Sequence, residues 1–187
     1  MTRGPRAHAI LLSGPVGSGK TTLLLEIGEI LAESGEPYAL VDLDWLAWLQ
    51  PAAETTVTVQ DALARNLRAV WETFRGAGVE RLVLGRFVES HEQLAAIRAA
   101  LADVDLFTIR LAVQREVLEE RLHRRDTGRE LDEHLALVAR SGPSGLEDAE
   151  IGNDDSRLPR EVALEILATA RWLPDVDPAS RVRAAAT

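Results

Sequence analysis

The sequence predicts an α/β fold, in which short buried strands of a parallel sheet alternate with helices. Two observations support this prediction. Short apolar runs recur along the chain, and most of them precede a longer segment with helical character. A glycine-rich segment also joins the first apolar run directly to the first helix. With 187 residues, 46% of them hydrophobic, the chain suits one domain with a sizeable core. We expect this domain to span residues 1–173, with a frayed start at 1–7 and a loose tail at 174–187.

The most specific feature lies between the predicted strand 8–12 and the predicted helix 21–33. There the chain matches the pattern G-x-x-x-x-G-K-[ST], whose backbone N–H groups close around phosphate oxygens. The predicted phosphate-binding residues are Gly14, Pro15, Val16, Gly17, Ser18, Gly19, Lys20, Thr21 and Thr22. Lys20 is the only lysine among 21 basic residues, which sets this position apart from the arginines elsewhere. We therefore predict a nucleotide-phosphate site, with Lys20 reaching the β/γ-phosphates and Thr21 binding Mg²⁺.

The second predicted strand, 38–41, ends in two carboxylates. Alternation along a strand places Asp42 and Asp44 on the same side. Ligands of open α/β sheets bind beyond the carboxyl ends of the strands, where the phosphate-binding segment also lies. The alternative is that both aspartates only cap the turn into the segment that follows.

Two further features after this strand could border the same site. Trp45 and Trp48 form a short amphipathic piece that is either an aromatic wall for a substrate or ordinary packing. A capping-box pattern then begins a helix over 58–74. The third strand, 81–88, carries Arg86 near its end. This arginine either faces the cleft, where it suits an anionic acceptor, or pairs with Asp42 or Glu89.

The second half of the chain carries a cluster of arginines. We expect a helix over 90–102, a strand over 106–113 and a helix from 115 that runs into a Gly-containing bend by 129. The arginines of this last segment are Arg121, Arg124, Arg125 and Arg129. They suit a mobile lid over a transferring phosphoryl group, or a solvated helix whose arginines pair with its own glutamates. A helix over 130–140, a short strand over 149–151 and a helix over 159–172 complete the prediction.

Composition excludes several classes of function. A formal net charge of −9 argues against nucleic acid as a primary partner. The absence of cysteine excludes disulfides, thiol catalysis and cysteine-based zinc sites. No apolar run reaches the ~18 residues needed to span a membrane. We therefore expect a cytoplasmic protein without a membrane partner.

The order of these features resembles the small phosphotransferases of the P-loop NTPase superfamily. A strand, phosphate loop and helix are followed by a strand ending in Asp-x-Asp and a late Arg-rich lid, as in the adenylylsulfate kinase, chloramphenicol phosphotransferase and gluconate/shikimate kinase group. The resemblance implies a three-layer sandwich with a five-stranded parallel sheet in the order 2-3-1-4-5 and helices on both faces. Right-handed crossovers would also place strand 1 centrally.

The resemblance also implies roles for individual residues. Lys20, Asp44, Arg121 and Arg125 would be catalytic, with Arg121 also near the nucleotide. Asp44 would contact the acceptor hydroxyl, and Asp42 would support the Mg²⁺ bound by Thr21. From the residues themselves, and not from the resemblance, we add Trp45 and Arg86 as candidate substrate-binding residues. The loop 153–156 would border adenine.

We therefore expect an ATP-dependent kinase of a small hydroxyl-bearing molecule, either a monomer or a homodimer, that uses ATP and Mg²⁺. ATP is favoured over GTP because no Asn-Lys-x-Asp motif is present. The alternative is a nucleotide-dependent switch that acts through a protein partner bound by the Trp45/Trp48 segment.

Overall fold

The computed structural model describes residues 6–142 and 145–172. A five-stranded sheet has the order β2-β3-β1-β4-β5, and every neighbouring pair of strands is parallel. This confirms the predicted α/β class and strand order. The predicted tail 174–187 lies outside the described residues, as do residues 1–5 of the predicted frayed start.

Most elements lie where the sequence predicted them, with shifts at their ends. The strands are β1 (Ala7–Ser13), β2 (Tyr38–Asp42), β3 (Arg81–Gly85), β4 (Val104–Ala112) and β5 (Ala149–Gly152). The helices are α1 (Lys20–Glu33), α2 (Leu43–Leu46), α3 (Val59–Gly76), α4 (His91–Ala100), α5 (Arg115–Arg125), α6 (Gly128–Arg140) and α7 (Pro159–Thr169).

Two boundaries differ from the prediction for local reasons. Strand β3 ends at Gly85 and not at 88, and the backbone N–H of Val88 donates to the side-chain oxygen of Ser13 and not to a backbone carbonyl of the neighbouring strand β1. Helix α5 ends at Arg125, after which Asp126 is extended. Gly128, at φ +58°, begins α6, so Arg129 belongs to α6 and not to the bend.

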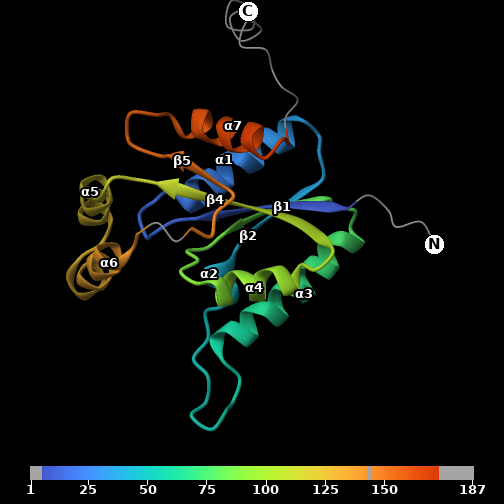
Figure 1. Cartoon of the computed structure of the whole chain (residues 1–187), viewed down its shortest axis with the longest axis horizontal. Helices are drawn as coiled ribbons and strands as arrows, with labels where there is room; N and C mark the ends of the chain where they lie inside the picture. The colour runs from blue at the N-terminus through green and yellow to red at the C-terminus, as the bar shows by residue number, and fades with distance from the viewer. Residues whose placement is uncertain (1–5, 143–144, 173–187) are drawn as a thin grey trace, which may run out of the picture.

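The central strand β1 is buried on both faces. Ala9 and Leu11 point into a core shared with α3 and α4, whereas Ile10 and Leu12 point into a core shared with α1 and α7. Figure 1 shows these two helical layers on opposite sides of the sheet. A parallel sheet covered on both faces explains why its strands are nearly continuous apolar runs in the sequence.

Capping residues begin the helices of one layer as the sequence predicted. The side chain of Thr58 accepts from the backbone N–H of Asp61, and the Asp61 carboxylate accepts from the backbone of Thr58, which completes a capping box at α3. Ser90 accepts from the backbone N–H of Gln93 at the start of α4. Each bond satisfies a backbone donor that the helix cannot pair internally.

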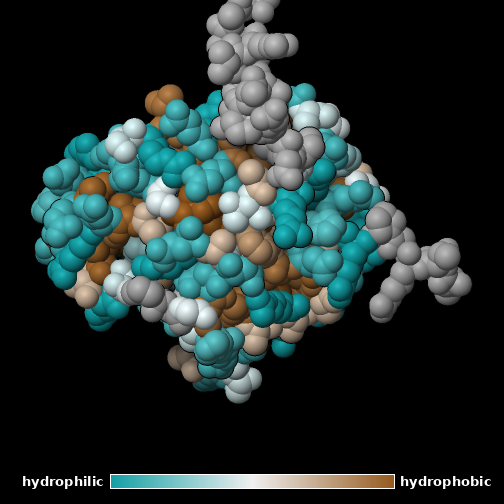
Figure 2. All heavy atoms as spheres, turned by 45° about the horizontal axis from the view of Figure 1, so that its top comes forward, coloured by the Kyte–Doolittle hydropathy of each residue, from teal (hydrophilic) through white to brown (hydrophobic). Residues whose placement is uncertain are grey.

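Helices α5 and α6 form a separate pair beyond the end of the sheet (Figure 1), which we call the lid. Leu118 and Leu122 of α5 pack with Val138 of α6, and Val16 of the loop between β1 and α1 packs against the same cluster. The lid is therefore anchored by apolar contact to the loop that it overlies. On the molecular face in Figure 2, hydrophilic side chains predominate, with hydrophobic ones visible between them. Within the described residues, no helix is long and apolar enough to cross a membrane.

The double-sided core generates a prediction about stability. Leu11→Ala should lower the free energy of unfolding by about 2–5 kcal/mol, because Leu11 is fully buried in the central strand and its loss leaves a cavity. The matched control is Leu25→Ala on α1, where the side chain is 60% exposed and the change should stay within about 0.5 kcal/mol. Urea unfolding of the three proteins measures both values. Equal losses in the two variants would contradict the assigned core.

Candidate active site

The loop between β1 and α1 has the backbone shape that its glycines permit. Gly17 and Gly19 adopt φ values of +82° and +91°, in the left-handed region that other residues rarely occupy. A Cβ atom on Gly19 would also lie 2.5 Å from Nδ2 of Asn153. Glycine is therefore required here for two reasons. The turn needs a left-handed backbone, and the loop that follows β5 packs too closely for a Cβ atom at Gly19.

Lys20 lies at the start of α1 and folds back over its own loop. Its Nζ donates to the carbonyl oxygens of Gly14 at 2.8 Å and Pro15 at 3.1 Å. Burial lowers the pKa of Lys20 from 10.5 to about 8, while the charges of Asp44 and Asp42 act in the opposite direction. The lysine is thus a desolvated cation that gains from a nearby anion.

Thr21 and Asp42 meet as the sequence suggested. The Thr21 hydroxyl donates to Oδ2 of Asp42 over 3.3 Å, so two oxygen ligands of the kind that Mg²⁺ prefers lie together. The other oxygen of Asp42 accepts from the backbone N–H of Asp44 and caps α2. The capping alternative is therefore correct for Asp42, and the same side chain also reaches Thr21.

Asp44 is correctly placed, but not for the reason the sequence gave us to expect. Strand β2 ends at Asp42, so strand alternation does not orient Asp44, which lies in the first turn of α2. Nη1 of Arg86 binds Oδ1 of Asp44 at 3.0 Å, and the Arg86 side chain is only 15% exposed. Burial raises the pKa of the Asp44 carboxyl, and the positive charge of Arg86 opposes that rise. Arg86 thus pairs with Asp44, which was not among the partners that the sequence suggested, Asp42 and Glu89.

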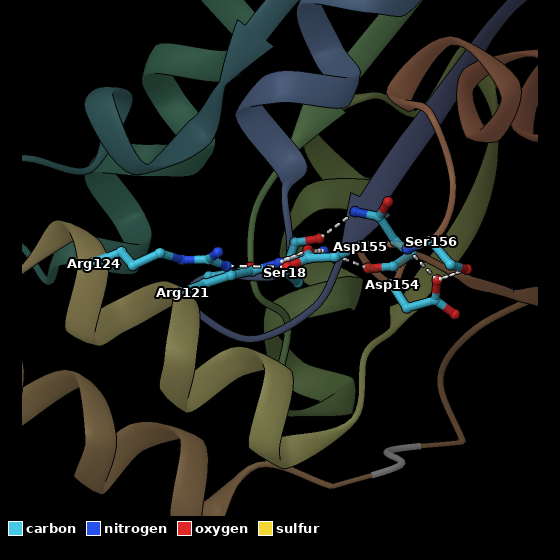
Figure 3. Close-up of polar contacts among 8 residues, drawn as sticks. Ser18, Arg121, Arg124, Asp154, Asp155 and Ser156 are labelled. Atoms are coloured by element: carbon cyan, nitrogen blue, oxygen red, sulfur yellow. Dashed lines mark hydrogen bonds and ion pairs between the residues drawn. The ribbon is translucent and has the colours of Figure 1, made fainter.

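Arg121 of the lid joins three segments of the chain. Its Nη1 donates to the carbonyl of Gly17, and its Nη2 donates to the carbonyl of Asn153. Nε and Nη2 both bind Oδ1 of Asp155, and Arg124 binds the other oxygen of that carboxylate. Figure 3 shows both arginines extending from α5 toward Asp155, on the loop between β5 and α7.

The other two lid arginines also pair with carboxylates. Arg125 binds Asp126 through Nε and Nη2, and Arg129 pairs with Glu133 within α6. Together with the partners of Arg121 and Arg124, these contacts differ from the predicted alternative, in which the arginines pair with glutamates of their own helix α5.

A cleft of about 630 Å³ brings most of these groups together. Of the predicted site residues, those that line it are Val16, Gly17, Gly19, Lys20, Thr21, Thr22, Asp42, Asp44, Arg121 and Arg125. Gly14 and Pro15 lie behind it, where their carbonyls hold Lys20. Ser18 is buried, and its carbonyl accepts from Asn153 at 2.7 Å.

Trp45 and Arg86 lie outside this lining. Trp45 is 69% exposed and stacks on Trp48, which is 77% exposed, with ring centroids 5.1 Å apart. Arg86 reaches the site only through Asp44. The structure therefore brings most residues of the glycine loop, the two aspartates and two lid arginines together in one cleft. The two tryptophans follow Asp44 in the sequence, but they form an exposed pair outside the cleft lining.

The structure adds residues that the sequence did not single out. Leu158 and Pro159 line the cleft together with Arg157, whose Nη1 donates to the carbonyl of Gly152. Asp126 and His134 lie behind Arg125 in the lid. Proline at the start of α7 was recognisable as a helix signal, but nothing in the local pattern marked the other residues.

Comparison with solved structures supports the fold. The APS kinase of Mycobacterium tuberculosis, solved with AMPPNP and APS, matches with a TM-score of 0.64 and 22% identity over 90% of this chain and 99% of its own. A gluconokinase from Sinorhizobium meliloti matches with a TM-score of 0.58 and 18% identity over 98% of this chain and 100% of its own. A shikimate kinase from Bacteroides thetaiotaomicron has a TM-score of 0.56, with 17% identity over 88% and 98% of the two chains. At these identities the likeness shows the α/β fold of P-loop kinases.

Comparisons of the sequence itself found no match. No family model matches the chain, and neither does any curated protein.

The environment of Lys20 generates a prediction that the composition makes easy to test. Because Lys20 is the only lysine, selective ¹⁵N-lysine labelling should give a single side-chain signal. Its titration midpoint should lie near 8 and not near 10.5, because burial penalises the charged amine. Adding inorganic tripolyphosphate should raise the midpoint, since an anion favours the protonated form. A midpoint near 10.5 in the free protein would contradict the desolvated environment.

Proposed function

We propose that this chain is an ATP-dependent phosphotransferase that moves the γ-phosphoryl group of Mg-ATP to a hydroxyl group of a small molecule. The observation that carries the proposal is the single cleft that Lys20, the Thr21–Asp42 pair, Asp44 and two lid arginines share. Phosphoryl transfer needs cations around the transferring group and a polar group that orients the acceptor, and this cleft offers both. The likeness to small-molecule kinases at the level of fold agrees with it.

The phosphate side of the site fits Mg-ATP. Thr21 and Asp42 would hold Mg²⁺, directly or through its water ligands, and the ion neutralises charge on the β- and γ-phosphates when it is bound. Lys20 would exchange its two carbonyl partners for phosphate oxygens, which satisfy a buried cation better than neutral carbonyls do. The backbone of the glycine loop and the start of α1 supply further donors.

The adenine would lie toward the loop between β5 and α7. Asn153, Asp154 and Asp155 line that part of the cleft, and the apolar side chains of Leu158 and Pro159 offer a surface for the ring. The chain contains no Asn-Lys-x-Asp motif to read guanine, which favours ATP.

Asp44 is the group we place on the acceptor. It lines the cleft near Asp42, and Arg86 holds one of its oxygens, so the carboxylate has a fixed direction. It would accept the proton of the attacking hydroxyl or orient that hydroxyl toward the γ-phosphorus. The proton moves from the acceptor oxygen to the carboxylate as the new O–P bond forms and ADP leaves.

One observation favours a second function, a nucleotide-dependent switch that acts through a protein. Trp45 and Trp48 form an exposed stacked pair that begins directly after Asp44. Aromatic side chains of this kind are frequent at the centres of protein interfaces. A partner that binds only the nucleotide-loaded chain, without turnover of any acceptor, would support the switch and not the kinase.

The experiment that tests the kinase is ADP release from Mg-ATP, with and without a panel of sugars, sugar acids, nucleosides, adenylylsulfate, aminocyclitols and phenylpropanoid antibiotics. We expect release that depends on one class of acceptor, and a loss of about 100-fold or more in Lys20→Ala, because the buried cation for the phosphates is removed. The control Arg98→Ala, an exposed change on α4, should leave the rate unchanged. Tight ATP binding without any acceptor effect would contradict the kinase.

Asp44→Asn separates the role in transfer from a role in nucleotide binding. We expect kcat to fall by about 100-fold or more, because the carboxylate acts on the acceptor, while the dissociation constant for ATP changes by less than about threefold. Asp105→Asn is the matched control, since Asp105 lies near the opposite end of β4 from the cleft. Calorimetric titration with ATP and steady-state kinetics provide the two numbers. An equal loss of binding and turnover would remove Asp44 from the acceptor side.

A further inference from the structure

Three side chains form a closed polar network where the two lid helices meet. Arg125 is the last residue of α5, Asp126 follows it, and His134 lies on α6. Nε of Arg125 donates to Oδ1 of Asp126 at 2.6 Å, and Nη2 donates to Oδ2 at 3.0 Å. Nδ1 of His134 lies 2.7 Å from the same Oδ2. One carboxylate thus connects the cleft-lining arginine to the second lid helix.

Burial within the network is uneven. The Asp126 side chain is only 4% exposed, whereas the Arg125 side chain is 54% exposed and reaches the cleft. The pKa of Asp126 is lowered to about 2, first by the hydrogen bonds from Arg125 and also by the one from His134. Asp126 is therefore an ionised, buried anchor at neutral pH, and the arginine extends from it. A bidentate pair of this kind fixes the plane of the guanidinium as well as its position.

The hydrogen bond from His134 fixes the histidine tautomer. A carboxylate only accepts, so Nδ1 of His134 must carry the proton that it shares with Asp126. Nη2 of Arg125 also lies 3.4 Å from Nδ1 of His134, but both atoms are then donors, so no hydrogen bond forms between them. The role of His134 is to hold Oδ2 of Asp126. It does so from α6, so the arginine direction depends on both lid helices.

The two cleft-lining arginines of the lid differ in how much of their hydrogen-bonding capacity is free. Arg121 donates to protein acceptors through all three of its nitrogens. Arg125 donates only through Nε and Nη2, and its Nη1 has no hydrogen-bond partner among the described residues. The lid therefore uses Arg121 to join loops and leaves donors of Arg125 free for a ligand.

We propose that Asp126 and His134 are positioning residues that hold the Arg125 guanidinium at the wall of the cleft, aimed at the transferring phosphoryl group. This inference rests on the proposed function. Preorganised cations lower the barrier of phosphoryl transfer because no reorganisation is needed when charge develops. Loss of the anchor should therefore affect kcat and leave nucleotide binding nearly intact.

A metal ion is the competing use of these side chains. Ligand atoms of Asp126, Glu130 and His134 lie within 4.8 Å of one another. However, Arg125 already binds both oxygens of Asp126, so a cation would have to displace the guanidinium. Tight binding of Zn²⁺ to the purified full chain, abolished by His134→Leu, would overturn the positioning role.

The test is a double-mutant cycle that measures kcat. It uses the wild-type chain and its variants with the acceptor that the panel above identifies. Asp126→Asn should lower kcat by about 10- to 100-fold, with the KM for ATP changed by less than about twofold. In an Arg125→Gln background the same substitution should lower kcat by less than about twofold, because the anchored group is already gone. Asp132→Asn, an exposed change on α6, is the matched control and should have no effect. Additive losses across the cycle would overturn the proposal.

His134 provides an independent arm if Asp126→Asn does not fold. His134→Asn retains a donor close to the position of Nδ1 and should keep most of the wild-type kcat, whereas His134→Leu should lose about tenfold. The control His123→Leu, at an exposed position on α5, should be silent. Equal rates for the two His134 variants would overturn the role of the histidine. A wild-type chain that transfers no phosphoryl group would instead overturn the proposed function, and the inference with it.

Discussion

The cleft depends on hydrogen bonds that hold the glycine loop from outside. The amide of Asn153 donates to the carbonyl of Ser18, and Arg121 donates to the carbonyls of Gly17 and Asn153. The loop after β5 and the first lid helix therefore support a backbone turn that has few internal bonds of its own. Gly19 is needed here twice, because its left-handed backbone and its missing Cβ together admit the Asn153 amide. The shape of the glycine loop thus depends on contacts between segments more than 100 residues apart in the chain.

The charges that line the cleft balance, whereas the molecule as a whole is acidic: the lining holds four basic side chains, Lys20, Arg121, Arg125 and Arg157, and four aspartates, Asp42, Asp44, Asp154 and Asp155. The chain carries a formal net charge of −9, yet cations line the cleft and each one has a carboxylate near it. Lys20 lies near Asp44 and Asp42, Arg121 binds Asp155, and Arg125 binds Asp126. Asp155 and Asp126 hold Arg121 and Arg125 in place before any ligand arrives, whereas Lys20 is held by the carbonyl oxygens of Gly14 and Pro15. A polyanionic ligand would then meet charges that are already oriented.

Local pattern predicted the strands of the sheet and the glycine loop, whereas the strand order was implied by the resemblance to the P-loop phosphotransferases and by right-handed crossovers. Apolar runs mark strands buried on both faces, and the glycine motif marks a backbone shape. Asp44 lines the cleft, but strand alternation, which was the basis of its prediction, does not apply because the structure places it on α2. The network of Asp126 and His134 had no local signature, since its meaning depends on how α5 and α6 pack. Long-range partners such as Asp155 for Arg121 could not be read from spacing alone.

The site consists of two parts that differ in structure. One part lies at the ends of regular elements, and the other lies in an irregular segment of the chain. Lys20, Thr21 and Asp42 lie at the ends of α1 and β2, so the sheet fixes them. Beyond Asp44 the chain continues through the four-residue helix α2 into a long irregular connection before α3, with the tryptophans exposed at its start. Regular elements can position a transferring group to the tolerance that chemistry demands, while an irregular segment can change its sequence without disturbing the core. Under the proposed function, the sheet and the lid would therefore carry the reaction, and the segment that follows Asp44 would select the acceptor.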